Sequence, residues 1–154
     1  MTYIVQGLSP RPFAHLFTLD DAALAALRAR RVRAEGVGYP CRISLEEAGE
    51  GEKLILLNHV SHDVETPFRT SYAIFVREGA EQGPAFVDEL PPLLNRRRLS
   101  LRGFDTAGML RSANLAEPGE GDGAVRALLA EPDVAEVHAH NAAYGCFLAR
   151  IERD

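Results

Sequence analysis

Most of the side chains that could do chemistry lie in one stretch near the carboxyl end, residues 134–151. His138 and His140 are two residues apart there, and Cys146 follows after a short segment. Residues two apart on a strand project from the same side, about 7 Å from each other. An imidazole beside a thiol can serve as the base that forms a thiolate nucleophile, and imidazoles with a thiolate can also bind zinc.

The chemistry of this stretch depends on the register of a predicted hairpin. Two runs of alternating residues flank residues 141–145, a pattern that predicts antiparallel strands joined by a five-residue, glycine-ended turn. This register sets His140 opposite Cys146. Because successive strand residues point to opposite sides, one face should be apolar and the other reactive. The apolar face would hold Val137, Ala139, Phe147, Ala149 and Ile151, and the reactive face His138, His140, Cys146 and Arg150.

Several arginines lie within or at the end of predicted strands, where each must face water or find a partner. A guanidinium fork matches the geometry of planar anions, so convergence of two arginines with His138 or His140 would form an anion-binding pocket. The leading hypothesis is therefore binding of a small anionic molecule. Its candidate ligand-binding residues are Arg42, Arg77, Arg102, His138, Asn141, Arg150 and Cys41.

Two other functions fit the same residues. In the first, the protein is a thiol-dependent enzyme in which His140 activates Cys146, and Asn141 or a carboxylate orients the imidazole. In the second, it is a structural or partner-binding module in which Cys41 and Cys146 are buried and the arginines are surface charges. No glycine-rich phosphate loop, Gly-x-Ser-x-Gly elbow or Cys-x-x-Cys pair marks a familiar enzyme class.

We expect neither a bound metal ion nor a cofactor. His138, His140 and Cys146 could form a zinc-binding trio, but this two-histidine spacing is common without a metal and the place of Cys146 depends on the hairpin register. The two histidines and the aspartate of residues 59–63 straddle a strand end and a polar loop, a position typical of solvated side chains.

The composition is that of an ordinary globular protein. The 154 residues fit one domain, 1–154, and the net charge of -5 argues against a nucleic-acid partner. No apolar run approaches the roughly 18 residues of a membrane helix, and the first residues lack a secretion signal. We therefore expect a cytoplasmic protein with free cysteines and no membrane partner, and a homodimer is compatible with the sequence.

Strand patterns cluster along the chain instead of alternating with helices. Strands are expected at residues 2–5, 39–45, 53–60, 70–77, 98–105 and 109–116, in addition to the hairpin above. Helices are expected from Asp20 through Arg31 and from Asp122 to just before Pro132. Clustered strands favour an α+β fold, with a mainly antiparallel, curved sheet and two main helices.

Four short motifs together resemble a known family. They are Tyr39-Pro-Cys-Arg42, Ile74-Phe-Val-Arg-Glu78, Leu101-Arg-Gly-Phe-Asp105 and His138-Ala-His-Asn-Ala-Ala-Tyr-Gly-Cys146. In combination, over nearly the whole chain, they resemble a bacterial family known only as domain of unknown function 1203. The resemblance implies no activity, cofactor or catalytic residue, so the functional hypotheses depend on the side chains alone.

Overall fold

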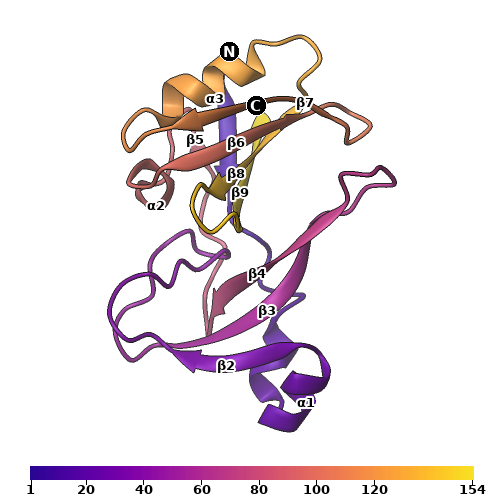
Figure 1. The fold of residues 1–154 in the computed structure, drawn as a ribbon. Coiled ribbons are helices and arrows are strands. Elements are labelled where there is room, and N and C mark those ends of the chain that lie inside the picture. The colour runs from indigo at the N-terminus through magenta and orange to yellow at the C-terminus, as the bar shows by residue number, and fades with distance from the viewer.

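The computed structural model describes residues 1–154, whose strands form two antiparallel sheets (Figure 1). The six-stranded sheet contains β1 (Tyr3–Gln6), β5 (Phe86–Val87), β6 (Leu99–Phe104), β7 (Leu110–Ala116), β8 (Glu136–Asn141) and β9 (Phe147–Arg153). Its strand order is β5-β1-β9-β8-β6-β7. The three-stranded sheet contains β2 (Ala29–Arg33), β3 (Lys53–His62) and β4 (Thr70–Arg77) in the order β2-β3-β4. The predicted α+β class with antiparallel strands is confirmed.

The helices are short. They are the 3-10 helix η1 (Ala14–Thr18), α1 (Asp21–Ala26), the single turn α2 (Pro92–Asn95) and α3 (Gly121–Leu129). Asp20 caps α1 by accepting a hydrogen bond from the Ala23 amide at 2.8 Å. None of these helices combines the length and apolarity needed to cross a membrane.

The first helix ends earlier than its sequence suggests. The chain turns at Arg28, which has a φ of 57°, and the next residues form β2. The prediction that this helix runs through Arg31 is therefore wrong. Pairing with β3 gives these residues a full ladder of backbone hydrogen bonds and buries Ala29, which outweighs the helix propensity of the arginines.

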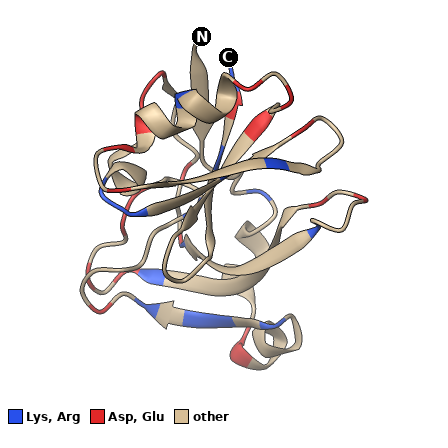
Figure 2. Cartoon of the chain, turned by 45° about the horizontal axis from the view of Figure 1, so that its top comes forward, with Lys and Arg blue, Asp and Glu red and all other residues tan.

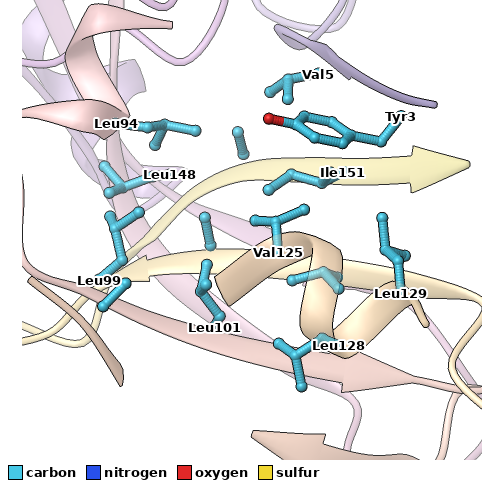
Figure 3. Packing of buried hydrophobic residues seen from close by; sticks show 14 of the residues in the cluster. Tyr3, Val5, Leu94, Leu99, Leu101, Val125, Leu128, Leu129, Leu148 and Ile151 are labelled. Atoms are coloured by element: carbon cyan, nitrogen blue, oxygen red, sulfur yellow. The ribbon is translucent and has the colours of Figure 1, made fainter. Parts of the chain in front are cut away.

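One face of the six-stranded sheet packs against α3 and forms the larger core, seen from close by in Figure 3. Val125, Leu128 and Leu129 of α3 cover Leu101 and Ile151 of the sheet. The predicted second main helix is confirmed, and its buried apolar residues recur with the helical period. We call this side of the sheet the helix face.

The segment 39–45 does not form the predicted strand. It makes only isolated bridges, between Pro40 and Glu47 and between Cys41 and Phe75, and Leu45 has a φ of 56°. A turn closed by the hydrogen bond from the Leu45 amide to the Cys41 carbonyl replaces the strand. This compact turn buries the whole side chain of Arg42, which is 2% exposed.

The last hairpin forms, but its register differs from the predicted one. Ala139 pairs with Ala149, whereas His140 pairs with Phe147, so Leu148 is an extra residue in β9. The predicted pairing of His140 with Cys146 is therefore wrong. A bulge of this kind reverses the facing of the residues on one side of it. Phe147 consequently lies on the side of His140, while Ile151 lies with Val137 as predicted.

Candidate metal centre

The side of the six-stranded sheet opposite α3 carries imidazoles and phenyl rings, and we call it the histidine face. It contains Arg102, Phe104, Glu136, His138, His140, Phe147 and Arg150. The three-stranded sheet packs against it through three histidine contacts. Between ring centroids, His62 lies 4.9 Å from His138, Tyr72 lies 5.0 Å from His140, and His59 lies 6.4 Å from Phe147.

A second bulge brings His62 to this face. Val60 pairs with Ser71 and His62 with Thr70, so Ser61 is an extra residue at the end of β3. The bulge turns His62 to the side of its sheet that faces His138. The expectation of solvated side chains at residues 59–63 is therefore wrong for His62, which is 4% exposed.

Three side chains that bind metals meet where the two sheets touch. His62, Glu136 and His138 each offer one ligand atom, and these atoms all lie within 4.8 Å of one another. The Nε2 of His138 is 3.0 Å from Glu136 Oε1, and the Nδ1 of His62 is 3.9 Å from the same oxygen. A tetrahedral zinc ion holds its ligand atoms about 3.4 Å apart, so small side-chain movements would enclose one.

The orientation of His62 is fixed from outside the cluster. Its Nε2 donates a hydrogen bond to the Gly108 carbonyl at 3.0 Å, which leaves Nδ1 as the free lone pair facing Glu136. Metal-binding histidines usually donate their second nitrogen in this way. Gly108 can approach so closely because it has no side chain: a Cβ there would lie 2.6 Å from Val64 Cγ1, and its φ is 84°.

The protonation states at this site suit a cation. Burial lowers the pKa of His138, although the adjacent Glu136 opposes the shift, and burial lowers the pKa of His140 to about 4. Burial alone would raise the pKa of Glu136, but the His138 hydrogen bond and the Arg150 charge outweigh it and lower this pKa. Near neutral pH the site therefore offers a neutral His138 imidazole and an ionised Glu136 carboxylate, which are the forms that bind metals.

The cluster opens into a polar cavity of about 700 Å³. Four carboxylates line it, those of Asp63, Asp105, Glu136 and Glu152, together with the side chains of Arg150 and Arg153. His62 and His138 lie in the wall of this cavity. An ion held by the three ligands would therefore keep a coordination position open to small molecules, as catalytic metal sites do and closed structural sites do not.

The four arginines of the predicted strands do not gather into one pocket; they are Arg42, Arg77, Arg102 and Arg150. Arg102 and Arg150 flank His138 across neighbouring strands, whereas Arg77 pairs with Glu52 at 3.2 Å on the other sheet. The Nη1 of Arg102 donates to the Tyr72 hydroxyl at 2.8 Å, and Arg150 pairs with Glu136 and Glu152. In Figure 2 the strands of the six-stranded sheet carry both basic and acidic residues, whereas those of the three-stranded sheet carry basic residues alone.

Arg42 lies apart from the cavity, inside the protein. It donates from Nε to the Phe147 carbonyl at 2.8 Å, from Nη1 to the Pro40 carbonyl at 2.6 Å and from Nη2 to Cys146 Sγ at 3.4 Å. Burial lowers the pKa of Arg42, and the adjacent Cys146 opposes this shift. The structure thus brings Cys146 to a guanidinium group.

The remaining candidates have mainly structural partners. His140 Nδ1 donates to the Gly145 carbonyl at 3.0 Å, and its ring packs on Tyr72 and Phe147. The Asn141 side chain accepts hydrogen bonds from two amides of the hairpin turn. Cys41 is fully buried, and both cysteines are free.

Sequence reasoning did not identify Glu136 as a ligand, and it set His62 aside as a solvated side chain of residues 59–63. Glu136 precedes His138 by two residues on a predicted strand, and this Glu-x-His spacing could have indicated a shared face. For His62 the histidine spacing at residues 59–62 was a signal, but its burial beside His138 depends on the bulge at Ser61, which the sequence does not reveal.

No curated protein and no solved structure matches this chain. One family model does match, over residues 38–153, a range that contains all three proposed ligands. That family is described as a protein of unknown function (DUF1203). The motifs that suggested the resemblance lie within the matched residues, and the chain belongs to the DUF1203 family.

Proposed function

We propose that this protein binds a divalent metal ion, zinc being the best fit, through His62, Glu136 and His138. The observation that supports the proposal is the meeting of these three ligand atoms within 4.8 Å, with His62 already oriented by the Gly108 carbonyl. Two imidazoles and one glutamate form a known zinc ligand set that leaves a fourth position free. The expectation of no metal, drawn from the sequence, is revised in this proposal.

The proposed ion replaces the proton that His138 and Glu136 share. Their hydrogen bond, Nε2 to Oε1 at 3.0 Å, occupies both ligand atoms without a metal. Binding requires the proton on His138 Nε2 to move to Nδ1, so that Nε2 presents its lone pair to the ion. Protonation of the imidazole competes with the metal, so zinc affinity should fall as the pH is lowered. Arg150 remains bonded to the other oxygen of Glu136 and keeps the carboxylate in place.

The experiment is zinc titration by calorimetry of protein first stripped with a chelator. Wild-type protein should bind one zinc ion, and His62→Gln should bind roughly a hundredfold more weakly. Glutamine can still donate to the Gly108 carbonyl from the position of Nε2, but it lacks the Nδ1 ligand. The matched control is His59→Gln in the same strand, which should bind zinc like the wild type. Absence of zinc binding by the wild type would refute the proposal.

A second candidate function is thiol chemistry at Cys146. The observation that favours it is the Arg42 guanidinium 3.4 Å from Sγ, since a neighbouring cation stabilises a thiolate. In this candidate function Arg42 activates Cys146, a role that the sequence analysis assigned to His140. Mass spectrometry after brief iodoacetamide treatment tests it, with the fully buried Cys41 as internal control. Fast modification of Cys146 alone supports the idea, and an inert Cys146 in the folded protein argues against it.

The small anionic molecule predicted from the sequence is a separate proposal. Arg42 and Arg77 are engaged elsewhere, so the arginines alone offer no common anion site. Arg150 and Arg153 do line the cavity beside the proposed metal. An anion would therefore bind next to the metal and not at an arginine cluster.

A further inference from the structure

We infer that the bound metal turns the cavity into a site for a small carboxylate anion. This inference depends on the proposed metal site and adds the class of ligand that the site accepts. It concerns the same cavity of about 700 Å³, whose wall contains His62, Glu136 and His138.

The charges of the cavity support the inference. Asp63, Asp105, Glu136 and Glu152 contribute four negative charges to the lining. Arg150 and Arg153 in the lining, with Arg69 and Arg111 as ion-pair partners of Asp63 and Asp105, contribute four positive charges. The four carboxylates and the four guanidinium groups of the metal-free cavity therefore balance one another. A divalent ion leaves two positive charges uncompensated, and the complementary ligand is an anion.

The positions around the metal favour a carboxylate. The metal has three protein ligands, so at least one coordination position faces the cavity. Arg150 contacts Glu136 and Glu152 through Nη2, lines the cavity and has a side chain that is 54% exposed, so its guanidinium group is accessible to a ligand in the cavity. A planar carboxylate can accept from such a fork and bind a metal through the same group.

A second group in the wall has no partner within the protein. The hydroxyl oxygen of Ser61 is buried and makes no hydrogen bond, and Ser61 lines this cavity beside His62. Buried polar atoms are nearly always hydrogen-bonded in folded proteins. Ser61 is thus available to donate to an oxygen of a bound ligand, next to the metal and Arg150.

The experiment uses the full chain loaded with cobalt(II), whose visible spectrum reports changes in coordination, and succinate as the probe. Succinate should change the cobalt spectrum saturably with a stoichiometry of one, while metal-free protein shows no succinate binding by calorimetry. Arg150→Met, measured at saturating cobalt, should bind succinate roughly tenfold more weakly. The control Arg98→Met, whose partner Glu117 lies away from the cavity, should behave like the wild type.

Each outcome separates the two proposals. Cobalt binding with an unchanged spectrum at millimolar succinate overturns this inference and leaves the metal site standing. Equal succinate binding with and without cobalt also overturns it, because the metal would then contribute nothing. Failure of cobalt and zinc to bind overturns the metal site, and the inference with it. Phosphate in place of succinate tests the ligand class, and a stronger response to phosphate would overturn the assignment to carboxylates.

Discussion

The two faces of the six-stranded sheet are both buried, yet they are built from different chemistry. On β8, Val137 and Ala139 point to the helix face, while Glu136, His138 and His140 point to the histidine face. The helix face packs aliphatic side chains against α3. The histidine face packs imidazoles against phenyl rings and the second sheet.

The difference separates the face that stabilises the fold from the face that carries the proposed metal site. Aliphatic burial is favourable by about 25 cal/mol per Å² of apolar surface removed from water. Buried imidazoles must instead keep hydrogen-bond partners and lose part of their ability to take up a proton. This cost is the physical reason for placing the proposed metal site on the histidine face.

The largest expected effect tests the stabilising role of the helix face. Leu101→Ala should lower the free energy of unfolding by about 3 to 4 kcal/mol, because Leu101 is fully buried under α3 and its truncation leaves a cavity. The matched variant Arg102→Ala, one residue away on the histidine face, should cost about 1 kcal/mol, since Arg102 is only partly buried. Urea unfolding measures both, and equal costs would contradict the comparison.

The next effect tests the histidine face through pH. His140 has a pKa of about 4 in the folded protein, below its ordinary value, so the unfolded chain takes up a proton that the folded protein excludes. The contribution of His140 to the free energy of unfolding is therefore fully present above about pH 6.5 and is lost as the pH falls toward 4. Metal-free protein should lose about 2 to 3 kcal/mol of unfolding free energy between about pH 7.5 and 4.5.

His140→Asn supplies the control for this pH effect. The asparagine amide can take the place of Nδ1 and donate to the Gly145 carbonyl without titrating. The variant should show a shallower loss of stability with acid in urea unfolding. The same slope in both proteins would show that other groups govern the pH dependence.

Elements with a sustained period could be predicted from the sequence. The strand at 70–77, the hairpin strands at 98–105 and 109–116 and the helix beginning near Asp122 all form close to the expected residues. In β6 the alternation of apolar and polar residues matches the burial of one face, and in α3 the buried residues recur with the helical period. The turn that buries Arg42 was missed, because a charged side chain gives no sign in the sequence that it will be enclosed.

The candidate site could be predicted only in part, and the reason lies in two bulges. His138 and His140 were expected on one polar face, and they lie there. The extra residues Ser61 and Leu148 depend on pairing with distant strands, which local patterns do not reveal. They bring His62 to the site and move Phe147 to the histidine face.

A third prediction tests the bulge in β3. Deleting Ser61 should turn His62 away from His138 and weaken zinc binding roughly a hundredfold, while lowering stability by only about 1 kcal/mol. The matched control deletes the exposed Glu65 in the loop that follows, which shortens the chain equally but leaves the bulge intact. Calorimetry with zinc and urea unfolding provide the measurements. Unchanged zinc affinity after loss of Ser61 would mean that the bulge does not position His62.

The smallest expected effect concerns Cys146, which the structure separates from the histidine face. The sulfur of Cys146 accepts a hydrogen bond from Arg42. Phe147 lies opposite His140, in the place that the sequence suggested for Cys146. Cys146→Ser keeps an acceptor near Arg42, so the free energy of unfolding should change by about 0.5 kcal/mol. Zinc affinity and the acid slope of stability should stay as in the wild type, because both depend on the histidines. A roughly tenfold change in zinc affinity would place Cys146 within the metal centre and would contradict its separation from the histidine face.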